Sequence, residues 1–158
     1  MRKQIKFLLL ALILFLSFSS LGFSCSSATL CTNACPKCDL SNAKLRKAYL
    51  AKADLRGTNL RGANLTEANL TSAFLTNANL SNANLTGAEL DKANLTGANL
   101  TEANLSGANL KKIKLNGANL SRANLTDTNL TNTDLSKANA NFKDAIGVIK
   151  DQPVTIGK

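Results

Sequence analysis

The sequence predicts an all-β solenoid, a chain that winds in short extended segments around an interior of leucine and alanine. The first observation is a leucine at every fifth residue from Leu40 to Leu135, twenty in all. The second is that the residue two places before each leucine is small: fifteen are alanine, three are threonine, and the other two are Cys38 and Ile113. The third is that proline is absent from this array, as stacked backbone ladders require.

A period of five residues excludes both an amphipathic helix and a flat strand. An α-helix turns by about 100° per residue, so steps of five spread the leucines around the whole cylinder. In a flat strand the side chains alternate with a period of two, so successive leucines would lie on opposite faces. A bend in every unit lets the leucine and the small residue two before it point to the same side. Glycine occurs six times and asparagine four times two places after the leucine, and both tolerate such a corner.

The tandem motif A(D/N)LXX, with asparagine before the leucine in twelve repeats, resembles the pentapeptide-repeat family over about 98 of the 158 residues. The resemblance implies a right-handed quadrilateral β-helix in which four pentapeptides form one coil. Twenty repeats then imply about five coils, and at ~4.8 Å per stacked strand the array would be roughly 24 Å tall. We expect the repeats to occupy residues 38–138 and the solenoid to be capped at both ends.

Residues 1–24 are typical of an export signal. Three basic residues precede an apolar run at 7–18, and small residues follow as far as Ser24. The run is shorter than the roughly 20 residues that a membrane span needs, so we favour a cleaved signal peptide over a retained anchor. The expected location is a periplasm, a thylakoid lumen or the extracellular space.

The cysteines lie in the linker at 25–37 and at the start of the array. Export to an oxidising compartment favours disulfides, for which Cys31, Cys35 and Cys38 are the candidates, with the pairing left open. The CPxCDL segment is similar to that of exported pentapeptide-repeat proteins of the thylakoid-lumen type, in which it implies a cap on the open first coil. Cys25 is a candidate for lipidation, since bacterial lipoproteins are cut just before a lipidated cysteine.

Three functional readings of the same cysteines are weaker than a structural disulfide. A Cys-x-x-Cys redox motif needs a βαβ context that lowers the thiol pKa, and a repeat array does not supply one. The spacing also matches iron–sulfur ligands of radical enzymes, but no barrel domain accompanies it. A zinc site formed by the four cysteines is as weakly supported as the iron–sulfur site. We therefore expect no metal and no cofactor.

Two groups of residues are candidates for an interaction surface. The first is a basic collar at the amino-terminal end of the array, which would meet anionic lipid headgroups, acidic glycans or an acidic protein. A solvated end that repels end-to-end stacking explains the collar equally well. The second is the aromatic pair Tyr49 and Phe74, which replace the usual asparagine, although isolated exposed aromatics are common. The collar comprises Lys37, Lys44, Arg46, Lys47, Lys52, Arg56 and Arg61.

Two departures from the repeat carry further expectations. Ile113 replaces a small inward residue, which predicts a locally widened coil with Lys111, Lys112 and Lys114 displayed around it. Beyond the last leucine the register fails, and residues 139–158 contain a short apolar segment. Because an open solenoid end exposes core and free strand edges, we expect this segment to form a carboxy-terminal cap.

The composition predicts a protein without catalysis. The chain has no histidine and no tryptophan, its carboxylates are scattered, and a leucine-filled solenoid has no cavity. We expect an exported structural or protein-interaction module with an unknown protein partner and unknown oligomeric state. The alternative is a membrane-anchored envelope lipoprotein held by Cys25 and the basic collar. The DNA-mimic topoisomerase inhibition of acidic family members does not suit an apparently exported chain with a net charge of +9. Nucleic-acid binding is not expected either, because the chain has few aromatic residues, an export signal and a basic collar limited to one end of the array.

Overall fold

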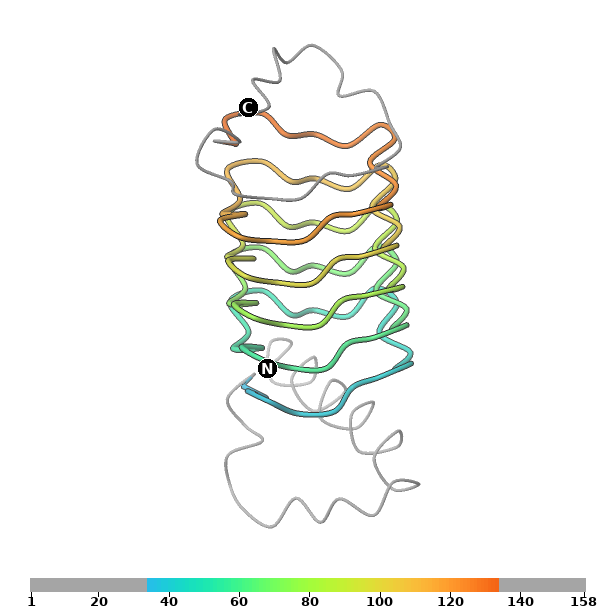
Figure 1. The fold of residues 1–158 in the computed structure, drawn as a ribbon, viewed down its shortest axis with the longest axis vertical. Helices are drawn as coiled ribbons and strands as arrows, with labels where there is room; N and C mark the ends of the chain where they lie inside the picture. The colour runs from blue at the N-terminus through green and yellow to red at the C-terminus, as the bar shows by residue number, and fades with distance from the viewer. Residues whose placement is uncertain (1–33, 134–158) are drawn as a thin grey trace, which may run out of the picture.

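The computed structural model describes residues 34–133, which form one rod of stacked coils (Figure 1). Neighbouring coils pair in parallel with a register of twenty residues, from the bridge between Ala34 and Asp54 to the bridge between Asn109 and Asn129. One coil therefore contains four five-residue units, one for each side. The predicted signal, most of the cysteine linker and the predicted carboxy-terminal cap lie outside the described residues.

We number the four sides of the rod by the first full unit that each contributes. The first side begins with Leu40, the second with Leu45, the third with Leu50 and the fourth with Leu55. A residue and the residue twenty places later lie on the same side in adjacent coils. This register assigns every surface residue to a column.

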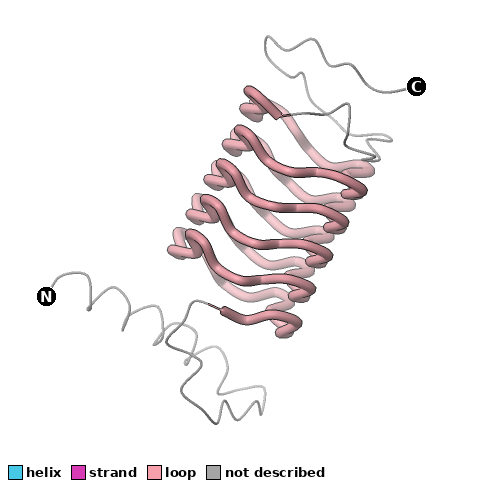
Figure 2. Tube along the Cα trace, turned by 90° about the vertical axis from the view of Figure 1, so that its left-hand side faces the viewer, coloured by secondary structure: helices cyan, strands magenta, loops and turns pink. Residues whose placement is uncertain are grey.

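Residues 34–133 contain single bridges and neither a continuous strand nor a helix (Figure 2). The reason is that each side contributes only one bridged residue, the one before the leucine, before the chain turns again. In that respect the expected extended segments are shorter than strands. No helix in the described part of the chain is long and apolar enough to cross a bilayer.

The corners of the rod are tight turns with a left-handed residue. In a typical unit the amide of Ala63 donates to the carbonyl of Leu60 at 3.0 Å, and the corner residue Gly62 has φ of 65°. A positive φ at the third residue is characteristic of a type II turn. All twenty corners from Lys37 to Asn132 share it, although ten of them hold neither glycine nor asparagine. The predicted corner at this position is therefore confirmed, and its backbone is left-handed even where the side chain rarely adopts that conformation.

The interior of the rod is filled by leucine and alanine, as the sequence predicts. Every leucine of the array from Leu40 to Leu130 is at most 6% exposed, and those of the central coils are fully buried. The inward alanines from Ala53 onward fill the space between them. Thr58 and Thr128 are buried at the same inward position. The functional surface of the described rod is therefore its outside.

In the interior coils of the described rod, hydrogen bonds between coils satisfy three of the five amides in a typical unit. The amide of Leu60 donates to Asn79 at 2.7 Å, that of Gly62 to Ser81 at 2.9 Å, and that of Asn79 back to Thr58 at 2.9 Å. The inward residue uses its amide in the turn. The amide directly after the leucine has no backbone partner in this scheme, so its acceptor has to come from a side chain.

Candidate interaction surfaces

The residue before each leucine supplies that acceptor. Asn64 Oδ1 accepts the amide of Thr66 at 3.1 Å and its hydroxyl at 2.7 Å. All twelve asparagines at this position in the described array, together with Asp39 and Asp54, accept the amide two residues later. Each is an Asx turn, in which a short side chain caps its own backbone. Sequence reasoning missed this role, although the recurring Asn-Leu-Thr and Asn-Leu-Ser triplets carry its signal.

We call the residue before each leucine the ladder residue. Some ladder residues cannot form the cap. A phenyl ring and an ammonium group offer no hydrogen-bond acceptor, so Phe74 and Lys114 leave the amides of Thr76 and Asn116 without this partner. Phe74 is 49% exposed and Tyr49, another ladder residue, is 61% exposed. The predicted aromatic contact points are therefore at the surface, and they replace a residue that would stabilise the fold.

The exceptions are confined to one half of the rod above the first coil. On the first and second sides, every ladder residue from Asn59 upward is asparagine. Within the described residues from Asn59 upward, the third and fourth sides carry the others: Phe74, Glu89 and Lys114. Tyr49 lies on the third side of the first coil. Above the first coil, the ladder position of the described rod is thus always asparagine on two sides and varies in residue type on the other two.

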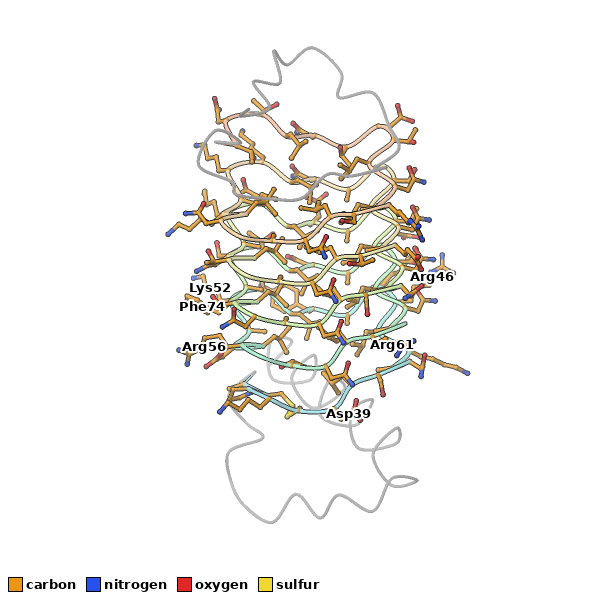
Figure 3. The ribbon with its side chains drawn as sticks, in the orientation of Figure 1. Asp39, Arg46, Lys52, Arg56, Arg61 and Phe74 are labelled. Carbon is orange, nitrogen blue, oxygen red and sulfur yellow. A yellow bond between two sulfur atoms is a disulfide. The ribbon has the colours of Figure 1, made fainter. Side chains whose placement is uncertain are left out.

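The basic collar does not form one patch. Its residues are distributed over all four sides, and Figure 3 shows Lys52 and Arg56 at one edge of the rod with Arg46 and Arg61 at the opposite edge. Acidic residues also neutralise part of it: Arg46 and Lys47 both contact Glu67, at 3.0 Å and 3.1 Å. As a single docking surface, the collar is weaker than its sequence predicts.

Arg56 makes the most complete of these pairs. Its Nε donates to Asp54 Oδ1 at 2.8 Å and its Nη2 to Oδ2 at 2.7 Å, a two-pronged arrangement. The hydrogen bond from this side chain lowers the pKa of Asp54 below its usual value. Hydrogen bonds from Arg46 and Lys47 likewise lower the pKa of Glu67.

The unit around Ile113 differs from the others. In every other described unit the amide of the inward residue donates to the carbonyl three residues earlier, which is that of a leucine except at Cys38, but the amide of Ile113 does not. The carbonyl of Leu110 instead accepts the hydroxyl of Thr133 at 2.7 Å. Ile113 itself is 4% exposed, so its larger side chain is accommodated inside the coil. This unit therefore differs from its neighbours in its hydrogen bonding, and the expected widening of the coil stays a prediction.

At the start of the array, a disulfide joins Cys35 and Cys38 with their Cα atoms 5.5 Å apart. Cys38 lies at the inward position of the first coil, and Thr58 above it donates its hydroxyl to the carbonyl of Cys35 at 2.6 Å. The candidates Cys25 and Cys31 lie outside the described residues. Within residues 34–133, no group of three His, Cys, Asp or Glu side chains is placed to hold a metal ion.

These features define a class of protein, a repeat solenoid with a leucine-filled interior and an outer surface arranged in four columns. The family profile of pentapeptide repeats matches eight copies between residues 25 and 144, in the segments 25–62, 38–77, 63–102, 78–117 and 103–144. The chain therefore belongs to the pentapeptide-repeat family.

Solved structures agree with this assignment. A pentapeptide repeat protein from the Arabidopsis thaliana thylakoid lumen is 34% identical, with a TM-score of 0.61 over 69% of this chain and 77% of that one. The pentapeptide repeat protein Rfr23 from the cyanobacterium Cyanothece 51142 is 32% identical, with a TM-score of 0.58 over 73% of this chain and 88% of that one. No curated protein matches the sequence. The fold shared with these relatives is the right-handed quadrilateral β-helix.

Proposed function

We propose that this protein is an exported, non-catalytic module that acts through its outer surface, as a structural element or by binding another protein. The observation that carries the proposal is the filled interior. From Leu55 to Leu120 every leucine of the array is at most 2% exposed, so the described coils leave no space for a substrate. A regular rod with long columns suits binding or scaffolding.

Three features support export. Residues 1–24 have the charge and hydropathy of a signal peptide. A disulfide between Cys35 and Cys38 suits an oxidising compartment, because cytosolic thiols are kept reduced. A relative with 34% identity comes from a thylakoid lumen. In this proposal residues 25–37 close the amino-terminal end, residues 38–138 form about five coils, and residues 139–158 close the other end.

Export is tested by fractionation and intact-mass analysis of the accumulated protein. We expect a soluble species in the exported fraction whose chain begins at Cys25. An unprocessed chain in the cytosol would overturn the proposal. A diacylated Cys25 in a detergent-dependent membrane fraction would replace it with the envelope lipoprotein.

The interaction role is tested in the exported compartment. The protein is immobilised through its carboxy terminus and exposed to an extract of that compartment, with Phe74→Asn as the matched variant. We expect a protein that the wild type retains and the variant loses, since Phe74 is a half-exposed apolar residue on the varied half of the rod. Retention of the same proteins by both would show that this position is not part of a binding surface.

A further inference from the structure

The corner between the third and fourth sides carries a column of positive charge. Lys52, Lys92 and Lys112 occupy this corner in register, interrupted only by Ser72. Lys111 and Lys114 lie immediately beside Lys112, on the third and fourth sides. We call these five lysines the lysine edge. Most of its members are outside the basic collar, and only Lys52 belongs to both.

The lysine edge holds most of the uncompensated charge of the rod. Residues 34–133 contain twelve Lys and Arg, of which five form ion pairs with carboxylates in that range. Seven therefore have no ion pair within the described part of the chain. Four of the seven belong to the lysine edge (Lys52, Lys111, Lys112 and Lys114), and the other three are Lys37, Lys44 and Arg61 on other columns.

The carboxylates nearest to the edge already have partners. Asp91 contacts Lys92 at 3.6 Å, and Asp54 is held by Arg56 at 2.7 Å. Glu89 accepts the side-chain amide of Asn109 at 2.7 Å on the face of the third side. Glu89 keeps its negative charge beside the edge, because the amide of Asn109 is uncharged. None of these acids forms an ion pair with the other four edge lysines, whose ammonium groups can therefore contact an external anion.

The unit 111–115 departs from the stable form of the repeat in several respects at once. Lys112 has φ of 55°, where glycine is preferred, a strain that it shares with the nine other described corners that hold neither glycine nor asparagine. Lys112 also stacks one coil above Lys92, and like charges at stacked positions are destabilising. Lys114 cannot cap the amide of Asn116. The amide of Ile113 does not form the hydrogen bond that closes the turn in the other described units. Local rules broken together in one unit, without a visible structural gain, indicate a functional surface.

The shape and chemistry of the edge fit a flat anionic surface. The corner is convex and its lysines are exposed, apart from the half-buried Lys111, so it offers no groove for an extended peptide. Lysine acts as a point charge and lacks the two-pronged geometry with which arginine selects individual carboxylates. Tyr49 and Phe74 are exposed on the two sides that meet at this corner, and Figure 3 shows Phe74 and Lys52 at the same edge of the rod. Aromatic and basic residues together are characteristic of protein surfaces that contact lipid headgroups.

We propose that the rod rests its lysine edge against a membrane surface rich in anionic lipid headgroups. The column from Lys52 to Lys112 spans three coil spacings, roughly 14 Å at about 4.8 Å each, which is long enough to meet several headgroups. Phe74 and Tyr49 enter the headgroup region on either side. The proposal goes beyond the exported interaction module and does not depend on it, since the edge is present wherever the rod is folded.

The test is sedimentation with vesicles of phosphatidylcholine alone or of equal parts of phosphatidylcholine and phosphatidylglycerol, using the protein in the form that the cell accumulates. We expect binding to the anionic vesicles that weakens with salt. The triple variant Lys111→Gln, Lys112→Gln, Lys114→Gln should lower the partition coefficient roughly a hundredfold, since a lysine near an anionic surface contributes about 1 kcal/mol. All variants share one amino terminus, so the difference between them does not depend on residues 1–33.

A matched control removes the same charge from other columns, with Lys37→Gln, Lys44→Gln and Arg61→Gln. This variant should retain most of the binding, and an equal loss in both triples would overturn the proposal. The single variant Lys112→Gly suits the left-handed corner and guards against misfolding of the triple. It should weaken binding roughly fivefold by the same constant.

Three further outcomes would also overturn the proposal. Displacement from vesicles by inorganic phosphate, beyond the effect of chloride at equal ionic strength, would indicate a site for the free anion. Failure to bind anionic vesicles, combined with lysine-dependent binding to a polyglutamate peptide, would assign the edge to an acidic protein. Equal binding to both kinds of vesicle would show that the contact is not electrostatic.

Discussion

At the scale of single residues, the side-chain oxygen before each leucine completes the backbone of this fold. Ladder asparagines such as Asn64 and Asn94 cap the amide that the inter-coil hydrogen bonds leave over. Lysine or phenylalanine at the same position cannot do so. The rod therefore carries a stability cost wherever its ladder departs from asparagine or aspartate.

We predict that Lys114→Asn stabilises the protein. The new side chain can cap the amide of Asn116, and a net hydrogen bond contributes about 0.5–1.5 kcal/mol. The reciprocal change Asn94→Lys, one coil below on the same side, removes an existing 3.1 Å cap and should destabilise by a similar amount. Urea unfolding followed by circular dichroism measures both. Equal stability of the two variants and the wild type would show that the cap contributes nothing.

A second residue-scale prediction concerns acid. The folded pKa values of Asp54 and Glu67 are lowered by Arg56 and by Arg46 with Lys47, so their pairs contribute stability at neutral pH. That contribution is lost as the pH falls below about 4 and through the folded pKa values. The melting temperature should therefore decline in this range.

Asp54→Asn provides the control for the acid effect. The amide oxygen of asparagine can still cap the residue 56 amide, as it does at other ladder positions, but the side chain no longer titrates. The variant should show a smaller loss of melting temperature between neutral pH and acid. An identical pH profile in wild type and variant would contradict a contribution from this pair.

At the scale of the repeat unit, Ile113 and Thr133 act together across adjacent coils. Thr133 supplies the hydroxyl that the Leu110 carbonyl accepts at the one corner of residues 34–133 where the inward amide does not donate. Thr58 is placed in the same way above Cys38, which is also larger than alanine. An enlarged inward residue is thus followed, one coil later, by a threonine that satisfies the carbonyl beside it.

We predict that Thr133→Val destabilises the protein by about 1–3 kcal/mol, because it removes the hydroxyl from a partly buried carbonyl. In an Ile113→Ala background the effect should be smaller, since the inward amide can then donate as it does elsewhere. A double-mutant cycle by chemical denaturation measures this coupling. Thr128→Val is the control: the Leu125 carbonyl also accepts an amide at 3.2 Å, so its loss should be less. If the destabilising effects of Thr133→Val and Ile113→Ala were simply additive, the Thr133 hydroxyl would not be replacing the amide of Ile113.

At the scale of the whole molecule, the leucine period and the coil register are separate constraints. The leucines repeat every five residues, whereas a side repeats every twenty. Removing one unit keeps all leucines inside and rotates everything above the cut by a quarter turn. Removing four residues moves every later leucine out of register with the core.

We therefore predict that deletion of residues 79–83 leaves a cooperatively folded rod, whereas deletion of residues 79–82 does not. Thermal unfolding by circular dichroism distinguishes them. The five-residue deletion also separates Lys52 from Lys112 by one side, so it should weaken vesicle binding while the fold persists. A folded four-residue deletion would contradict a core fixed by the leucine period.

The sequence predicted the core well and the surface poorly. A leucine every fifth residue determines its own burial, because every unit repeats the same bend, and the corner residues were recognisable from glycine and asparagine. Which cations lie together depends on the twenty-residue register, and grouping by sequence position produced a collar that the structure divides among four sides. The Asx caps could not be predicted without knowing which backbone amide has no partner among the hydrogen bonds between coils. Lys52, Lys92 and Lys112 become neighbours in a column only when the chain is read in steps of twenty.

The constant register also determines how the chain assembles. Every contact between coils joins residues about twenty apart, so adding coils does not lengthen the loops that must close. Closing the first coil is the slow, entropically costly event, and each later coil adds to an edge that already presents its donors and acceptors. Folding can then proceed like a zipper from whichever coil closes first, and the length of the rod can change during evolution with little effect on the speed of folding.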